Sequence, residues 1–267
     1  MNWKAILTGA TVLACSAALL AGCGSTEKAP STDNAAEMGK IIVGLDDNFP
    51  PMGFKDENNK IVGFDVDLAE EAAKRLGREV EFKAIDWSSK EAELKSGRVQ
   101  VLWNGLDITE KRKESMLFSK PYMDNHQIIF VKKGNTAVTD EKSLAGKTVG
   151  TQSGTAEEYM DASDFYKKEV KEVKKYPDYV AAFMDLENGR LDAVIGDEIV
   201  GRYYMSKHPD TLDALDVVVG PVSEFGIAFA KDNTKLRDEV QKVLDEMKAD
   251  GTIAKISTKW FAKDITK

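Results

Sequence analysis

The stretch VLWNGLDITEKRKESMLFS, residues 101 to 119, combines an apolar run with groups that could bind an anion. The run ends at Asn104 and Gly105, and a basic, helix-forming segment follows. Free N–H groups at a helix start favour negative charge, and the guanidinium of Arg112 can bind a carboxylate through two hydrogen bonds. The segment therefore predicts an anion site, with a surface arginine on a charged helix as the alternative.

Two further segments carry acids or aromatic residues directly after predicted strands. GLDDNFPPMGF places Asp46, Asp47 and Phe49 after an apolar strand, and loops at the carboxyl ends of parallel strands are where α/β folds bind ligands. An Asx-type turn with Phe49 in the core is the alternative. AIDWSSKEAELKSG places Trp87 at a helix start, where it is either a hydrophobic staple or a pocket wall.

Two segments in the second half are predicted strands that run into turns of small residues. In GTQSGTAEEY, Thr155 and the neighbouring N–H groups could accept an anion. In VIGDEIVGRYY, Asp197 at the strand end could receive an ammonium group. Ser, Thr and Asp at such positions are also ordinary helix N-caps, so each signal is weak by itself.

The elements that position these residues alternate between short apolar runs and amphipathic helical stretches. KIIVGL, residues 40 to 45, is short and β-branched, and the following helical stretch keeps its apolar residues on one face until Gly77. Further strand candidates are VEFKAI, VQVLW, QIIFV, KTVGT, LDAVIG, DVVV and GIAFA, interleaved with helices such as 177 to 188 and 234 to 250. This alternation predicts an α/β fold with mostly parallel sheets covered by helices.

The N-terminal residues predict export and lipid attachment. Residues 1–22 hold Lys4, an apolar run and small residues before Cys23, which is typical of a lipoprotein signal peptide; an uncleaved anchor is the alternative. Residues 23–39 are small and polar and predict a flexible tether. Cys15 would leave with the signal and Cys23 would carry lipid, so we expect no disulfide and no catalytic or metal-binding thiol.

Charge and residue spacing exclude several functions. Without Lys4 the chain has 36 Lys and Arg against 45 Asp and Glu, a net charge of −9, which disfavours a nucleic-acid partner. His126 and His208 are isolated, and no Ser-His-Asp, metal-ligand or phosphate-loop spacing is present. We therefore expect no enzyme, no metal and no cofactor.

Several motifs together resemble one known family. The segments VGFDVDLAEEAAKRLG, GLDITEKRKESMLFSKPY, KSLAGKTVGTQSGT, NGRLDAVIGDE and EMKADGTIAKISTKWF, in this order, are similar to the polar amino acid family of substrate-binding proteins of ABC importers, over residues 40–263. The resemblance implies a two-lobed, hinged fold. Lobe 1 would combine residues 40–125 with 224–267, and lobe 2 would span 128–220.

The resemblance also assigns roles to individual residues. Arg112 matches the arginine that binds the ligand α-carboxylate, with help from main-chain groups at Asn104, Gly105 and Asp107 and from Thr155 of lobe 2. Asp197 matches the acid that receives the α-ammonium. The ligand side chain would lie among Phe49, Trp87, Asp46 and Gln152. Some relatives on this fold are cyclohexadienyl dehydratases, which is the alternative function class.

Two positions depart from the family pattern. Relatives usually have Ser or Thr at position 107, whereas an ionised Asp107 cannot donate to a carboxylate and would repel it. Asp107 and Glu110 also have capping-box spacing, so Asp107 is alternatively a helix cap. Glu157 occupies a position that is often neutral in relatives.

These acids suggest a cationic ligand. Five acids expected in the cleft face one base: Asp46, Asp47, Asp107, Glu157 and Asp197 against Arg112. The α-ammonium of the ligand would engage one acid, and its carboxylate would engage Arg112. The surplus of acids that remains favours a ligand with a cationic side chain: arginine, lysine, ornithine or histidine. Alternatively, Asp47 and Glu157 point to water and do not contribute to the cleft. After the cationic amino acids, cystine is the next candidate ligand and glutamine follows it.

The resemblance implies partners and a location as well. We expect a monomer that closes its lobes on a free amino acid and docks on a membrane permease powered by a cytoplasmic ATPase. The lipid anchor would hold it outside the cytoplasm, at the surface of a Gram-positive cell.

Overall fold

The computed structural model describes residues 39–267. The predicted signal peptide (1–22), the lipidation site Cys23 and the tether up to residue 38 lie outside the described residues, so the fold does not bear on them. Among residues 39–267, no helix is long and apolar enough to cross a membrane.

Lobe 1 is built on a six-stranded sheet in which β5, β1, β6, β14 and β7 follow one another and β8 pairs with β14. A small sheet of three short strands lies beside it. The strands are β1 Lys40–Leu45, β5 Glu79–Ala84, β6 Val101–Asp107, β7 Met116–Phe118, β8 Met123–Asn125 and β14 Ser223–Ala230, with β2 Asn48–Phe49, β3 Gly53–Lys55 and β4 Ile61–Val62 in the small sheet.

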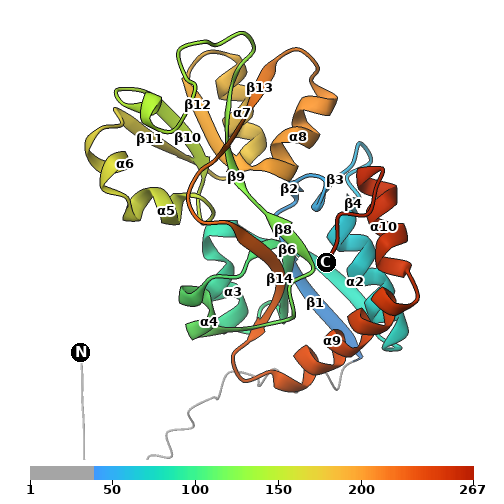
Figure 1. The fold of residues 1–267 in the computed structure, drawn as a ribbon. Helices are drawn as coiled ribbons and strands as arrows, with labels where there is room; N and C mark the ends of the chain where they lie inside the picture. Colours follow the sequence, from blue (N-terminus) through green and yellow to red (C-terminus); the bar gives the residue numbers. More distant parts are fainter. Residues whose placement is uncertain (1–38) are drawn as a thin grey trace, which may run out of the picture.

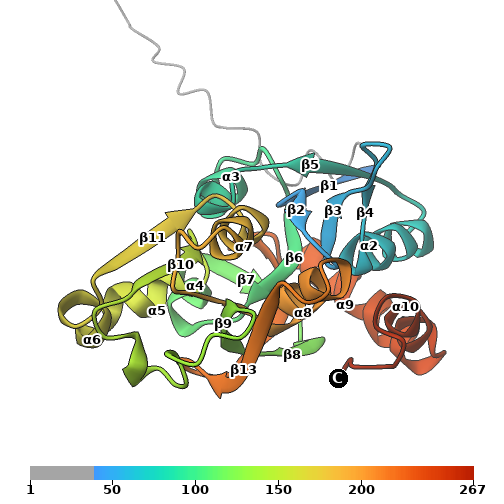
Figure 2. The same cartoon turned by 90° about the horizontal axis from the view of Figure 1, so that it is seen from above.

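The helices of lobe 1 cover this sheet because each buries one apolar face. In α2, Phe64, Leu68 and Ala72 recur at helical spacing and are almost fully buried. The C-terminal helices return to the same lobe, and the chain end pairs with β8 through Met123 and Thr266 (Figures 1 and 2). The helices are α2 Phe64–Arg75, the 3₁₀ turn Trp87–Ser89, α3 Lys90–Lys95, α4 Glu110–Ser115, α9 Thr234–Ala249 and α10 Thr252–Phe261.

Lobe 2 holds a five-stranded sheet in the order β11, β10, β12, β9, β13. Its strands are β9 Gln127–Lys132, β10 Thr148–Gln152, β11 Glu172–Tyr176, β12 Ala193–Asp197 and β13 Leu212–Val218. Its helices are the 3₁₀ turn Lys142–Leu144, α5 Glu157–Ala162, α6 Asp164–Lys168, α7 Tyr179–Glu187 and α8 Glu198–Lys207.

The chain passes between the lobes twice. β8 ends at Asn125 and β9 begins at Gln127, while β13 ends at Val218 and β14 begins at Ser223, as the adjacent ribbons in Figure 1 show. Ser223 lies opposite Asn125 in the pairing of β14 with β8, so the two passages run side by side. The predicted two-lobed α/β fold is confirmed.

The expectation of mostly parallel sheets holds only in part. β5, β1 and β6 are parallel, as are β11, β10 and β12, but β14 and β9 pair antiparallel with their neighbours. β9 and β14 enter their sheets directly from the other lobe, without the helical crossover that a parallel connection requires. The periodicity of apolar residues along the sequence does not distinguish parallel from antiparallel pairing.

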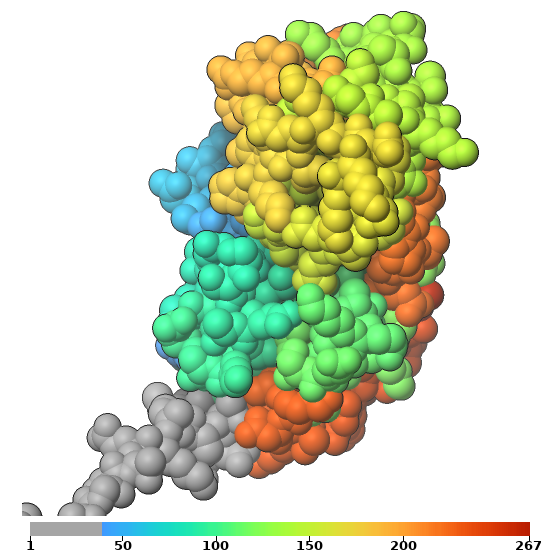
Figure 3. Space-filling view, turned by 90° about the vertical axis from the view of Figure 1, so that its left-hand side faces the viewer, coloured from blue at the N-terminus to red at the C-terminus, as the bar shows by residue number. Residues whose placement is uncertain are grey.

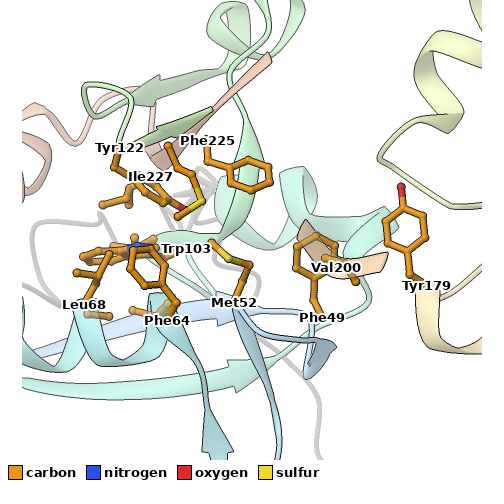
Figure 4. Close-up of a cluster of buried hydrophobic side chains, with 14 of the residues drawn as sticks. Phe49, Met52, Phe64, Leu68, Trp103, Tyr122, Tyr179, Val200, Phe225 and Ile227 are labelled. Atoms are coloured by element: carbon orange, nitrogen blue, oxygen red, sulfur yellow. The ribbon is translucent and has the colours of Figure 1, made fainter. Parts of the chain in front are cut away.

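The two lobes are in contact. Phe49 of lobe 1 and Tyr179 of lobe 2 are buried, with ring centroids 6.1 Å apart. Figure 4 shows Phe49 between the other lobe 1 side chains and Tyr179. Figure 3 shows the yellow segment of lobe 2 resting on the teal and green segments of lobe 1. The two lobes therefore adopt a closed arrangement around the predicted site.

Candidate functional site

Arg112 lies in the short helix α4 at the boundary between the lobes and is 2% exposed. Nη1 donates to the Asp107 carbonyl at 3.0 Å, and Nη2 donates to the Gly154 carbonyl at 2.9 Å and to Glu158 at 3.2 Å. Nε makes no hydrogen bond to any described residue. Arg112 is thus a buried cation that faces lobe 2 with a donor to spare.

The start of α4 is capped by Thr109, whose hydroxyl accepts the Arg112 N–H at 3.2 Å. The capping-box interpretation of Asp107 is therefore wrong. Asp107 is still part of β6, and its side chain turns to the strands that connect the lobes.

Asp107 and Asp197 approach one amide group from opposite lobes. Nδ2 of Asn125 donates to Asp107 at 2.9 Å and also makes a short hydrogen bond to Asp197. Ser223 donates to Asp107 at 2.5 Å, and Gln127 donates to Asp197 at 2.8 Å. Both acids are therefore held by the residues at which the chain passes between the lobes.

Burial and mutual repulsion shift the titration of this acid pair. Burial and, to a smaller extent, the charge of Asp107 raise the pKa of Asp197 to about 8. Burial also raises the pKa of Asp107. Two buried carboxylates disfavour ionisation together, and a positive charge placed between them would relieve this cost. The pair is chemically suited to an ammonium group.

Thr155 reaches the same region from lobe 2. Its hydroxyl donates to the Gln152 carbonyl at 2.9 Å and lies 2.8 Å from the hydroxyl of Tyr179. The Tyr179 hydroxyl in turn donates to Gln127 at 3.3 Å. These contacts connect the turn after β10 to Gln127 of β9, which donates to Asp197.

A second contact between the lobes joins Asp46 to Gln152. Nε2 of Gln152 donates to Asp46 at 2.7 Å, and the Asn48 N–H donates to the same carboxylate at 2.9 Å. Burial raises the pKa of Asp46 to about 7. Asn104 accepts the Asp46 N–H at 3.0 Å, and its own Nδ2 has no partner among the described residues.

Position 105 requires glycine. Its φ is +56°, and a Cβ there would lie 2.9 Å from the ring of Phe49. Its N–H donates to the buried carboxylate of Asp65 at 2.7 Å. This amide is consequently not free to bind an anion.

A cavity of about 460 Å³ adjoins the Asp46 contact and is formed by both lobes. Its wall includes Trp87, which is 3% exposed, and four aspartates against one lysine. The lining residues are Asp46, Asp47, Asn48, Lys55, Ile85, Asp86, Trp87, Pro177 and Asp178. An excess of carboxylates gives the cavity a negative potential.

Two of the five acids that the sequence placed in the cleft have ion-pair partners in their own lobe. Glu157 pairs with Lys175 at 2.6 Å and accepts the Gly154 N–H at 2.7 Å, and Asp47 pairs with Lys55. Counting Glu157 as surplus charge was therefore wrong. The count of one base was also wrong, because Lys90 lies buried next to Arg112.

The comparisons with known proteins agree with this architecture. Residues 41–263 match the model of bacterial extracellular solute-binding proteins, family 3. The chain belongs to this family.

Relatives of this family 3 protein are named for amino acids. The L-cystine-binding protein TcyJ of Escherichia coli (strain K12) is 35% identical over 237 residues, which cover 86% of this chain and 86% of the relative. An ancestral arginine-binding protein bound to arginine has 42% identity and a TM-score of 0.79, and covers 84% of this chain and 98% of its own. A histidine-bound substrate-binding protein of an ABC uptake transporter from Streptococcus pneumoniae has 30% identity and a TM-score of 0.82, with 88% and 97% covered.

Sequence reasoning about this solute-binding protein missed several residues of the site. Asn125 ends β8 and Gln127 begins β9, and both side chains donate to Asp197; two amide side chains at this spacing in an extended segment could have drawn attention to them. Asp86 and Asp178 are helix N-caps by type, and nothing in their local sequence indicates that they face one cavity. Among the described residues, no group of three or more His, Cys, Asp or Glu could hold a metal ion.

Proposed function

We propose that this solute-binding protein captures an amino acid with a cationic side chain, namely arginine, lysine, ornithine or histidine, for import by an ABC transporter. The observation that carries this proposal is the cavity between the lobes, where four aspartates face Lys55 alone. A guanidinium, ammonium or imidazolium group would neutralise the surplus negative charge there.

The amino acid head would bind at the other end of the site. The ligand carboxylate would take over the Arg112 donor now directed at Glu158, together with the unpartnered Nε. The hydroxyl of Thr155, which now donates to the Gln152 carbonyl, would turn to the carboxylate as a further donor. The α-ammonium would lie at the acid pair of Asp107 and Asp197. Each charge of the head would thus meet an opposite, buried charge.

The ligand side chain would extend from the head toward the acid-lined cavity. Phe49 and Trp87 would flank its apolar part, and both are buried at the boundary between the lobes. Asp46 and Gln152 already form a contact between the lobes beside the cavity, and the cationic end would reach them. This arrangement uses the aromatic faces for the methylene groups and the acids for the charge.

Closure would follow from contacts that only the two lobes together can make. A ligand that docks on Arg112 of lobe 1 gains Thr155 and Asp197 when lobe 2 closes, so its binding shifts the population toward the closed form. The closed protein would then dock on a permease that a cytoplasmic ATPase powers.

Cystine is the next candidate, and glutamine follows it. Cystine carries a second ammonium that the cavity could receive, but it also carries a second carboxylate that would face the aspartates. Glutamine has no charge to offset theirs. Both should therefore bind more weakly than arginine.

We also propose that the mature protein is a lipoprotein anchored through Cys23 at the surface of a Gram-positive cell. The sequence LAGC and the polar residues after it support this proposal. Replacing Cys23 by Ser should release the protein from the membrane fraction and abolish incorporation of a fatty-acid label. Retention of the variant in membranes would contradict lipid anchoring.

Ligand identity is tested by thermal shift of residues 24–267, which include both lobes completely. Each amino acid, with ornithine and cystine, is added at increasing concentration. A ligand at ~100 times its dissociation constant adds ~2.7 kcal/mol of stability. Arginine or another cationic amino acid should give the largest shift. A panel without any shift would remove the transport proposal, and a largest shift with cystine or glutamine would overturn the cationic preference.

A further inference from the structure

Lys90 is a buried cation at the first turn of α3 in lobe 1, and the proposed capture of a ligand gives it no contact. It is only 2% exposed, although lysine is almost never fully buried without a partner. Burial and, to a smaller extent, the nearby Arg112 guanidinium lower the pKa of Lys90 to about 8. A charge held this far from water needs acceptors that compensate for lost hydration.

The acceptors of Lys90 come from both lobes. Its Nζ donates to the Trp87 carbonyl at 3.3 Å and to the Gly154 carbonyl of lobe 2 at 2.9 Å, and it lies 5.4 Å from the Trp87 ring centroid. The acids Glu158, Glu91 and Asp107 act on it only at longer range. The three ammonium hydrogens thus have two carbonyls and one aromatic face available to them, and the ligand carboxylate is not needed.

Gly154 is the point where lobe 1 holds the turn of lobe 2. Its carbonyl also accepts Nη2 of Arg112 at 2.9 Å, so two cations of lobe 1 donate to one oxygen of lobe 2. Glycine suits position 154 because its φ is +79°, and a Cβ there would also lie 2.7 Å from Nζ of Lys90. Thr155, the proposed carboxylate donor, is the next residue along the chain.

We propose that Lys90 is a positioning residue for closure, which ties the wall formed by Trp87 to the Gly154 turn and so brings Thr155 to the ligand. The Trp87 contacts lie within lobe 1 and persist when the lobes separate, whereas the Gly154 bond exists only when they are closed. When a ligand carboxylate draws Arg112 away from lobe 2 contacts, Lys90 remains as the cation on the Gly154 carbonyl. Because this contact does not involve the ligand side chain, it stabilises the closed form with every ligand alike.

The test compares Lys90→Met with Lys95→Met in the purified protein. Methionine matches the lysine side chain as far as Cε and removes the charged Nζ, and Lys95 is an exposed lysine of the same helix, so Lys95→Met is a matched control. Lys90→Met should weaken binding about ten-fold, the lower range for a hydrogen bond to a charged group, with the loss mainly in a faster dissociation rate. The factor should be the same for arginine, lysine, histidine and glutamine, and Lys95→Met should match the parent protein.

Three results would overturn this role. Affinity that is unchanged or tighter in Lys90→Met means that the buried charge does not favour closure. A loss confined to one ligand means that Lys90 reads the ligand side chain. A lower melting temperature in the ligand-free variant, with affinity preserved once folded, means that it serves the fold alone. Lys90→Gln, which is neutral and too short to reach Gly154, should repeat the result of Lys90→Met.

The inference rests on the proposed capture by closure, so one measurement is made without ligand. Small-angle scattering of ligand-free protein should give a larger radius of gyration for Lys90→Met than for Lys95→Met. If the parent protein binds no amino acid, the proposed function fails, yet this difference still supports the role of Lys90. If amino acids bind but the radii and affinities are equal, only the role of Lys90 fails.

Discussion

At the end of the site around Arg112, partners distant in sequence hold the charged groups, whereas at the end around Asp178 each acid is held largely within its own loop. Asp107 and Asp197 share Asn125, and Arg112 reaches Gly154 of the other lobe. In contrast, Asp178 accepts an N–H from Ala181, three residues away. We call these parts the head end (Asp107, Arg112, Asn125, Thr155 and Asp197) and the side-chain end (Asp47, Asp86 and Asp178). Asp46 lies in the same cavity but accepts a hydrogen bond from Gln152 of lobe 2, so it belongs to neither group.

Because of this difference, substitutions at the two ends should affect ligand binding in different ways. A substitution at the head end alters contacts that join the lobes, so it should affect every ligand. A substitution at the side-chain end leaves the closing contacts in place and alters only the potential that a ligand side chain meets. The head end should therefore set whether amino acids bind, and the side-chain end should set which of them bind best.

The largest effect is expected for Arg112→Ala. The variant removes the donor pair for the ligand carboxylate and leaves Glu158 without its buried partner. Each hydrogen bond to a charged group contributes about 1.5–3 kcal/mol, so loss of two should weaken binding of all amino acids by at least ~100-fold. Isothermal titration calorimetry measures this effect. A variant that retained affinity for any amino acid would place the carboxylate elsewhere.

Asp107→Ser should have the next largest effect and decides to which end Asp107 belongs. If it holds the α-ammonium together with Asp197, the variant should weaken all amino acids by about ten-fold, the value of one charged hydrogen bond. If it faces the ligand side chain, only arginine, lysine, ornithine and histidine should lose affinity. Titrations with arginine and glutamine separate the two outcomes. Unchanged affinity for both would mean that Asp107 serves only the strands between the lobes.

The ligand-free protein should lose stability as the pH rises from about 4 to about 8. Burial raises the pKa of Asp46 and Asp65 to about 7 and that of Asp197 to about 8, from an ordinary value of 3.8. In this window the folded protein holds protons that the unfolded chain has released, so the free energy of unfolding falls with rising pH. Scanning calorimetry at pH 5 to 8.5 should show a falling melting temperature.

Two controls identify the contribution of the head end to this pH dependence. Asp197→Asn should remove the part of the slope nearest pH 8, and a saturating ligand should flatten the same part, because its ammonium keeps the acid ionised. A melting temperature that rises between pH 5 and 8 in the ligand-free protein would contradict these protonation states.

The smallest effect is expected for Asp86→Asn and Asp178→Asn. Both residues cap helices, and asparagine is as good a cap as aspartate, so each variant removes a charge and keeps the fold. Partly solvated charges contribute about 0.2–1 kcal/mol, so each variant should reduce the preference for arginine over glutamine by about 1.4- to five-fold. Competition binding with the two ligands measures the ratio. An unchanged ratio in both variants would remove the cavity from the specificity argument.

Much of the site was predictable from local sequence. The strand ends of β6, β10 and β12 carry Arg112, Thr155 and Asp197 close behind or within them, and strand ends of α/β sheets are where ligands bind. The structure brings Arg112 to the turn before Thr155, and Asp197 to Asp107 through Asn125. Residue type and position relative to a strand drew attention to these residues, and the family resemblance implied their roles.

The charge balance was not predictable in the same way. Glu157 counted as a free acid until the structure showed its ion pair with Lys175, and Lys90 did not count until its burial placed it beside Arg112. Pairing partners lie on neighbouring strands or opposite lobes, and their separation in sequence carries no information about their distance in space.

The alternation of strands and helices and the residue types at the strand ends are set by patterns within a few residues, and the order of several motifs along the chain indicated the family. Only the tertiary structure decided that Asn125 serves two acids, that Lys90 holds the turn of lobe 2, and that four aspartates line one cavity. Electrostatic interactions act through space, so which charges remain unpaired depends on the packing of both lobes.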